Sequence, residues 1–274
     1  MKFDSQGDLW MAGQRQVWHW DLIANKLRRI ELSAKLPETH RLSALGSDGL
    51  SLYVASTSGL FQLTWEPLRI FHYQLNDSSN GFSLGFSGSG DRLAWLHASG
   101  VYRIDRYGKA LIKLRGLDFI RQRDQVHYAP KANALWLLRK NHLMLVKDVG
   151  PQNAAQVVYQ AKGRLKDILQ WEDRIVTFTS RSVLFFTEGG QLIQSVPVAS
   201  GRRLMALAFS PQHHHYLFDD GVIETYNLTE QTRTSFVLPE KALQKSAKIA
   251  VWEDRVALLN GAKPRLFRLP KAVD

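Results

Sequence analysis

Three consecutive histidines, His213, His214 and His215, are the residues whose type most directly suggests metal chemistry. Neutral imidazole is a common ligand of zinc, copper and nickel ions. Neighbouring residues of an extended strand point to opposite faces, however, so three adjacent histidines cannot all face one ion. We therefore interpret these residues as a polar surface turn and predict no metal site.

Paired carboxylates, which can act as a general acid and a general base, occur as Glu172–Asp173, Asp219–Asp220 and Glu253–Asp254. The first and last pairs each follow a tryptophan and precede an arginine, and such a recurrence indicates a structural role. We expect them to cap turns and to form local ion pairs. The sequence motifs of zinc proteases, phosphate-binding loops, dinucleotide-binding folds, EF-hands and serine hydrolases are missing. We therefore predict no catalytic residue and no cofactor.

Positive charge dominates the composition. The 274 residues include 36 Lys+Arg and 25 Asp+Glu, which gives a formal net charge of +11 and a pI near 9.9. This surplus favours an anionic partner, whether nucleic acid, anionic lipid, a polyanionic glycan or an acidic protein. The absence of cysteine excludes disulfides, thiolate metal sites and cysteine nucleophiles. No apolar run reaches the ~18 residues of a membrane span.

The elements that carry these residues recur about every 40 residues. Each repeat contains an apolar strand, and these strands open at Leu9, Leu52, Leu93, Leu135, Ile175, Tyr216 and Val256. A further strand follows after a short turn, as in Gly59–Leu63, Gly100–Ile104 and Gly221–Thr225. Alternation of apolar and polar residues in these segments is typical of half-buried strands.

Two more strands complete most repeats. The inner strands contain Leu45, Phe86, Tyr128, Ile168, Phe209 and Ile249. Two repeats nearly copy one another, at Trp171–Ile175 and Trp252–Val256. Four short antiparallel strands in about 40 residues are typical of a propeller blade. The tryptophans expected to pack inside blades are Trp10, Trp95, Trp136, Trp171 and Trp252.

Two segments resemble repeats of bacterial β-propellers. Phe209–Pro211, with Leu217 shortly before Asp219, resembles the blades of WD40-like and TolB-like propellers. Asp4–Trp10 resembles the repeat of two-component-regulator propellers. The Gly-His and Trp-Asp pairs of true WD40 repeats are missing. The resemblance implies a seven-bladed β-propeller of bacterial type without identifying one protein.

We therefore predict an all-β chain that forms one seven-bladed β-propeller domain over residues 1–274, with about four antiparallel strands in each blade. The expected blades span about 1–33, 34–77, 78–118, 119–162, 163–199, 200–239 and 240–274. The first and last blades lack residues for a full set of strands. We expect either a three-stranded last blade or a natural chain that continues upstream of Met1.

In a propeller, the connections between blades and the turns between second and third strands gather on one face. Basic residues outnumber acidic ones in these segments, and Lys241, Lys245 and Lys263 add to them. The predicted partner-binding residues are Arg15, Arg41, Arg121, Arg123, Lys140, Lys162, Arg164, Arg181, Arg202 and Arg203. Because arginine suits carboxylates and phosphates, this face would attract an anionic partner.

The favoured function is a non-catalytic protein-interaction scaffold that uses a basic face to bind an acidic protein or peptide. It would serve in a bacterial cell-envelope assembly or as a sensor module, and the periplasm or cell envelope is favoured over the cytoplasm. One alternative is a propeller that binds nucleic acid or another polyanion, although no recognised motif supports it. Another is a propeller enzyme of the lactonase or quinoprotein kind, for which His127, Asp167 and Arg41 are the candidates near inner-strand ends.

Overall fold

The structure is a computed structural model of the chain. It describes residues 1–3, 7–13, 16–32, 42–47, 51–57, 59–65, 67–75, 81–86, 93–97, 100–104, 111–121, 123–129, 131–147, 154–198, 201–239, 243–244, 247–260 and 263–269. Within these ranges the regular elements are all β-strands, arranged in seven antiparallel sheets of strands that follow one another in sequence. None of the described segments is a helix able to cross a membrane.

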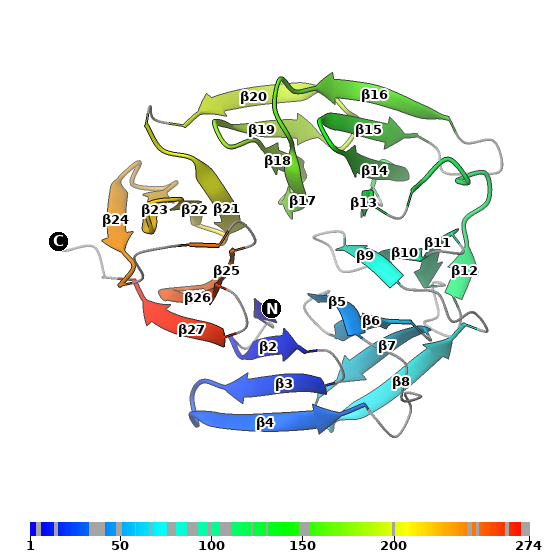
Figure 1. Cartoon of the computed structure of the whole chain (residues 1–274), viewed down its shortest axis with the longest axis horizontal. Coiled ribbons are helices and arrows are strands. Elements are labelled where there is room, and N and C mark those ends of the chain that lie inside the picture. Colours follow the sequence, from blue (N-terminus) through cyan, green and yellow to red (C-terminus); the bar gives the residue numbers. More distant parts are fainter. Residues whose placement is uncertain are drawn as a thin grey trace. The chain divides into compact units, whose positions relative to one another are not determined.

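The chain divides into two compact units. The larger unit contains Lys2–Phe178 and Leu184–Ser195, and the smaller unit contains Thr179–Val183 and Val196–Asp274 together with Met1. Figure 1 traces the strands of each unit along the chain.

The larger unit contains four complete sheets and most of a fifth. The first sheet is β1 (Lys2–Phe3), β2 (Leu9–Ala12), β3 (Gln16–Asp21) and β4 (Lys26–Glu31). The second is β5 (Leu42–Ser47), β6 (Leu52–Ser56), β7 (Gly59–Thr64) and β8 (Arg69–Gln74). The third is β9 (Gly81–Phe86), β10 (Leu93–His97), β11 (Gly100–Ile104) and β12 (Leu111–Lys113).

The fourth sheet is β13 (Gln125–Ala129), β14 (Ala134–Arg139), β15 (His142–Val146) and β16 (Ala155–Gln160). The fifth is β17 (Lys166–Trp171), β18 (Arg174–Phe178), β19 (Ser182–Thr187) and β20 (Leu192–Pro197). The first strands of successive sheets contact one another from β1 through β5, β9 and β13 to β17. This contact between first strands is what makes them the inner strands of blades.

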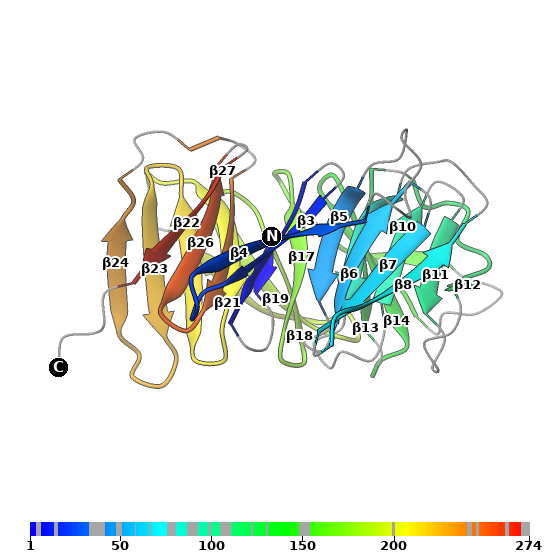
Figure 2. The same cartoon turned by 90° about the horizontal axis from the view of Figure 1, so that it is seen from below.

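The smaller unit contains the last two sheets. One is β21 (Leu204–Phe209), β22 (His213–Phe218), β23 (Val222–Asn227) and β24 (Arg233–Val237). The other is β25 (Lys248–Trp252), β26 (Arg255–Asn260) and β27 (Lys263–Arg268). Their first strands, β21 and β25, are also in contact, and Figure 2 shows the strands of this unit side by side with turns at both ends.

The predicted all-β, seven-bladed β-propeller class is confirmed. The last sheet has three strands, as expected for an incomplete last blade, and β1 of the first sheet has only two residues. The expectation that the chain continues upstream of Met1 stays a prediction.

Apolar side chains fill the space between neighbouring sheets. Trp136, Leu145 and Phe186 join the fourth and fifth sheets in one buried cluster, and Leu217 and Val256 lie in the cluster between the two sheets of the smaller unit. Each such side chain contributes about 1.5–3 kcal/mol when fully buried. This packing holds the strand ends, and the connections between them, in place.

Three of the five tryptophans assigned to blade interiors are fully buried, namely Trp10, Trp95 and Trp136. The Trp136 indole also donates a hydrogen bond of 3.2 Å to the Glu188 carbonyl oxygen. Trp171 and Trp252 are only partly buried. They are the last residues of the inner strands β17 and β25, so the core packing predicted for the five tryptophans is only partial for these two.

Candidate functional site

Five of the predicted basic residues lie at one end of the sheet β13–β16 in the larger unit. Arg121 and Arg123 lie in the connection that enters β13, Lys140 in the β14–β15 turn, and Lys162 and Arg164 in the connection from β16 to β17. All five side chains are exposed. We call these five residues the basic cluster.

Backbone hydrogen bonds hold two of these connections together. The Leu165 amide donates to the Lys140 carbonyl oxygen at 3.0 Å, and the Ala161 amide donates to the Asn141 carbonyl oxygen at 2.9 Å. The Asn141 side chain returns a hydrogen bond of 3.2 Å to the Ala161 carbonyl oxygen. Lys140 has a φ of 55°, as the tight turn between antiparallel strands requires. Lys140, Lys162 and Arg164 therefore share one surface.

An ion pair attaches the connection that enters β13 to the end of β14. Arg139 Nη2 lies 2.6 Å from Asp124 Oδ2, and Arg139 Nε lies 3.0 Å from Oδ1. The Asp124 side chain is 2% exposed and also accepts a hydrogen bond of 2.8 Å from the Arg121 amide. The hydrogen bonds between Arg139 and the Asp124 carboxylate raise the pKa of Arg139 above the ordinary arginine value. Asp124 thus positions Arg121 beside the β14–β15 turn.

The carboxylates in the same segments do not neutralise the basic cluster, which keeps an excess of positive charge. Asp124 is neutralised by Arg139. Asp167 accepts a hydrogen bond of 3.0 Å from the Gln125 side chain. Asp118 is exposed. Among the described residues, no carboxylate forms an ion pair with a member of the basic cluster.

Three other predicted basic residues lie together in the smaller unit. Arg181 is in the β18–β19 turn, and Arg202 and Arg203 precede β21. The Leu204 amide donates to the Ser180 carbonyl oxygen at 2.9 Å, and the Val198 amide donates to the Arg181 carbonyl oxygen at 2.8 Å. These hydrogen bonds bring the turn and the connection between sheets to the same strand ends.

Carboxylates already neutralise two of these arginines. Arg202 Nε lies 2.9 Å from Asp220 Oδ2, and its Nη1 lies 2.7 Å from Glu224 Oε1. Arg203 Nε lies 2.9 Å from Asp219 Oδ2, and the hydrogen bond from the Arg203 amide is the main cause that lowers the pKa of Asp219. The local ion pairs expected of Asp219–Asp220 are present.

The remaining predicted basic residues cannot be placed in this site. Arg15 and Arg41, together with Lys241 and Lys245, lie outside the described residues. Lys263 begins β27. The prediction that all ten residues form one partner-binding face therefore stays a prediction.

The histidine triplet is not a surface turn, and that interpretation is wrong. His213, His214 and His215 begin β22, and His214 and His215 are buried. The turn lies earlier, where the His213 amide donates to Ser210 Oγ at 3.1 Å. The rings of His213 and His215 lie 5.9 Å apart, whereas His214 packs against Phe209. No group of three potential metal-binding side chains occurs in the described part of the chain.

The repeated acidic pairs occupy equivalent hairpin turns. Glu172 and Glu253 have φ values of 54° and 50°, so each closes the turn between the first and second strands of its sheet. The local ion pairs expected in these turns are not found among the described residues. The Arg174 guanidinium instead lies 5.1 Å from the centre of the Trp171 ring. The pairs have a turn-forming role, as expected.

A chain of hydrogen bonds begins at His127, the histidine considered for the enzyme alternative, and runs through the partly buried Gln170 to the buried Glu188. His127 Nε2 lies 2.9 Å from Gln170 Oε1, and Gln170 Nε2 donates to Glu188 Oε1 at 3.1 Å. Burial raises the pKa of Glu188. Gln170 thus uses its two amide atoms to satisfy both neighbours, and this network links β13, β17 and the β19–β20 turn. Sequence reasoning did not identify Gln170 or Glu188.

No protein-family model matches the chain, and no curated protein matches it. Solved structures match it by shape. One, titled "Crystal Structure of Mitotic Checkpoint Complex", has 11% sequence identity and a TM-score of 0.66, and the match covers 98% of this chain and 86% of the other. Another, "Crystal Structure Of The C-Terminal WD40 Domain Of Sif2", has 11% identity and a TM-score of 0.60, with 98% and 95% covered.

A third structure, "Crystal structure of Nidogen/Laminin Complex", has 10% identity and a TM-score of 0.57, and the match covers 86% of this chain and 95% of the other. Identities this low carry information about the fold alone. The comparisons agree with the strand order in describing a seven-bladed β-propeller with WD40-like structural neighbours.

Proposed function

We propose that this protein is a non-catalytic interaction module that binds an acidic segment of a partner protein through the basic cluster. The observation that supports the proposal is a group of five exposed basic side chains with no ion pair to any described carboxylate. The connections that carry them are hydrogen-bonded to one another, so the charges are presented together before a partner arrives.

The basic cluster can hold an acidic partner both by long-range attraction and by the geometry of its side chains. Neighbouring cations raise the local concentration of an acidic partner and speed its association, and salt weakens this effect. Arginine can also hold a carboxylate through two parallel hydrogen bonds. Rigid connections reduce the ordering cost of binding. Protein partners are a common use of propellers with WD40-like neighbours, and this fold-level analogy supports the same function.

The test measures binding of a fluorescent peptide rich in glutamate and aspartate by anisotropy at several salt concentrations. Wild-type protein should bind, and affinity should fall as salt rises. Replacement of Lys140, Lys162 and Arg164 by glutamate should weaken binding by at least about tenfold, because several charge-assisted contacts are lost.

A matched control carries the same change in net charge elsewhere. Lys26, Arg28 and Arg69 are exposed on the outer strands β4 and β8, and their replacement by glutamate should leave affinity within about threefold of wild type. Equal losses in both triple variants would mean that net charge alone drives binding, and the proposed site would be abandoned. Tighter binding of an oligonucleotide than of the acidic peptide at equal salt would instead support the polyanion alternative.

We place this interaction in a bacterial cell-envelope assembly. The support is the resemblance of two repeats to bacterial propellers. Fractionation of the source cells tests this placement. Recovery of the protein with cytoplasmic markers, away from envelope proteins, would contradict it.

A further inference from the structure

A cavity of about 680 Å³ lies between the two sheets of the smaller unit. The β21–β22 and β23–β24 turns form one side, and the β25–β26 turn with Leu269 forms the other. Arg202 and Arg203 precede β21, whereas its last residue, Phe209, lines the cavity, so the two sites occupy opposite ends of this strand. Ligand pockets typically have volumes of about 300–1,000 Å³.

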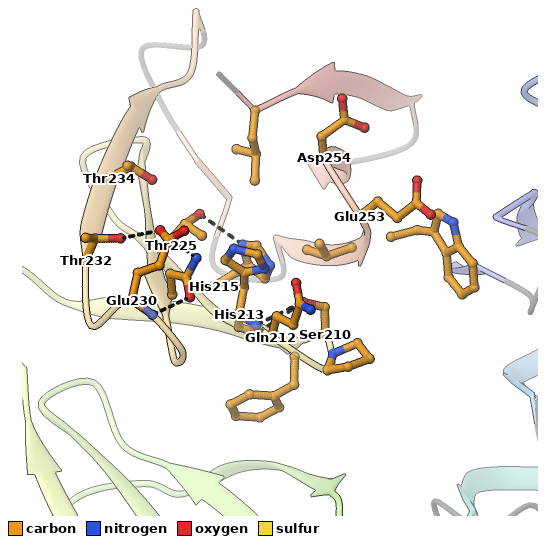
Figure 3. Close-up of a pocket in the computed structure, with 16 residues that line it drawn as sticks. Ser210, Gln212, His213, His215, Thr225, Glu230, Thr232, Thr234, Glu253 and Asp254 are labelled. Carbon is orange, nitrogen blue, oxygen red and sulfur yellow. Dashed lines mark hydrogen bonds between the residues drawn. The ribbon is translucent and has the colours of Figure 1, made fainter. Parts of the chain in front are cut away.

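A buried histidine in the wall has one polar atom without a partner. His215 is 1% exposed, and its Nδ1 lies 3.0 Å from Thr225 Oγ1. Its Nε2 is buried and has no hydrogen-bond partner among the described residues. Figure 3 shows the His215 ring in the middle of the cavity lining. A buried polar atom left unpaired costs about 1–3 kcal/mol. Because water does not reach Nε2, this atom lies behind the surface that a ligand in the cavity would touch.

The charged groups of the lining are all acidic. They are Glu230, Glu253 and Asp254, and among the residues that the structure describes no lysine or arginine lines the cavity. No basic side chain in the described ranges forms an ion pair with these carboxylates. Figure 3 shows Glu230 beside Thr232 on one side and Glu253 and Asp254 on the other. Local charge in the cavity is therefore opposite to the net charge of the chain.

The Glu230 carboxylate is held in one orientation. Asn227 Nδ2 donates to Glu230 Oε2 at 3.0 Å, and Thr232 Oγ1 donates to the same oxygen at 3.3 Å. These bonds leave Oε1 available to a ligand. An acceptor that is already oriented loses less entropy when it binds a cation.

Apolar side chains complete the lining. They are Phe209, Pro211, Val251, Trp252 and Leu269. An aromatic ring attracts a nearby cation through its π face, and aliphatic groups favour the hydrocarbon portion of a ligand. The combination of carboxylates and apolar surface fits a ligand that is both cationic and partly apolar.

We propose that this cavity binds an ammonium or guanidinium group carried on an apolar stem, with the cation attracted by the carboxylates of the lining and the stem against its apolar side chains. A lysine or arginine side chain and a free alkylamine share this chemistry. The inference does not rest on the acidic-partner proposal, because the basic cluster belongs to the larger unit and shares no residue with the cavity.

Isothermal titration calorimetry with the full chain tests the cavity. The probes are N-acetyl-lysine methylamide, its uncharged analogue N-acetyl-norleucine methylamide, n-butylamine and a lysine-rich peptide. The lysine derivative should bind at least about tenfold more tightly than the norleucine derivative, because the charged hydrogen bonds are lost in the latter. Tighter binding of the peptide than of both small cations identifies a protein segment as the source, and equal binding identifies a small amine.

The chain offers a matched pair of variants. Glu253→Gln with Asp254→Asn removes two charges from the cavity, and Glu172→Gln with Asp173→Asn makes the same change in the equivalent turn of the larger unit. The first double variant should lose about tenfold or more in affinity for the lysine derivative, and the second should match wild type. Binding of the norleucine derivative as tight as that of lysine, equal effects of both double variants, or no binding at all would overturn the proposal.

Discussion

The backbone of Gly59 packs directly against the carbonyl oxygen of Tyr73 on the neighbouring strand β8, so closely that a Cβ at position 59 would overlap this oxygen. Gly59 has a φ of 146°, a conformation that residues with side chains rarely adopt. Gly100 occupies the equivalent position at the start of β11 with a φ of 140°. A Cβ there would meet Lys113 Cε at 2.6 Å, the flexible end of an exposed side chain.

We predict that Gly59→Ala lowers the free energy of unfolding by about 3 kcal/mol, because backbone must move to relieve the overlap. Gly100→Ala should cost about 1 kcal/mol, since Lys113 can move away while the backbone strain remains. Urea unfolding followed by tryptophan fluorescence measures both. Equal losses would show that backbone conformation alone decides the cost.

The ion pair between Asp124 and Arg139 supports the second prediction. Asp124→Asn leaves a partly buried guanidinium without its counter-charge and should lower the free energy of unfolding by about 3 kcal/mol. Arg29→Gln breaks the exposed pair with Glu31, whose side chains are 47% and 56% exposed, and should cost less than about 1 kcal/mol. The difference between the two urea midpoints is the measurement. A midpoint of Asp124→Asn within error of the Arg29→Gln value would contradict this account.

Glu224 lies between Arg202 and Arg233 and is 7% exposed. Glu224→Gln removes the charge that both arginines share, and we expect it to lower the free energy of unfolding by about 1–2 kcal/mol. This is less than for a fully buried ion pair, because both guanidinium groups reach solvent. The loss should shrink in concentrated salt, which screens the repulsion left between the two arginines. A loss that is the same at low and high salt would mean that the lost hydrogen bonds to the carboxylate, and not the repulsion between the arginines, are responsible.

The sequence was sufficient to predict the fold because each blade repeats the same local pattern. The strand that opens at Leu52 and the strand that starts at Gly59 lie where their apolar runs and turn residues indicated. Periodicity of this kind is a local property, so it can be detected even where the individual sequence motifs are weak. The predicted opening at Tyr216 was three residues late, because His213–His215 replace the apolar residues that begin the equivalent strands. The Ser210–Pro211 turn was the signal that could have placed β22 correctly.

The sites were harder to predict because they depend on partners distant in sequence. Arg203, just before β21, forms an ion pair with Asp219, just after β22, and Gln170 is hydrogen-bonded to His127 of the preceding sheet. No spacing rule reveals which of these groups will be paired. The same limit applies to the cavity, because residues from two sheets line it. Trp252, which the sequence places in the core, is one of these lining residues.

His215 makes the stability of the protein depend on pH in acid. Burial is the main cause that lowers its pKa to about 3, and the neighbouring His213 and His214 add to the effect. Thr225 on β23 contacts the ring, and the acidic residues facing the same cavity are Glu230, Glu253 and Asp254. The unfolded chain binds a proton on His215 near pH 6.5, whereas the folded chain does not. The contribution of neutral His215 to the free energy of unfolding is therefore complete above pH 6.5 and is lost as pH falls towards 3.

The expected loss is up to about 1.4 kcal/mol for each pH unit below 6.5. Burial raises the pKa of Glu188, and protonation of that residue therefore acts in the opposite sense. Comparison of wild type with His215→Gln between pH 6.5 and 5 isolates the histidine, and the variant should show a shallower dependence of unfolding free energy on pH. The ring resonance of His215 is assigned by NMR as the one missing from this variant. In the wild type, its chemical shift should not change with pH down to about pH 4. A titration midpoint near 6 would mean that water reaches Nε2, and the cavity wall would not be dry at His215.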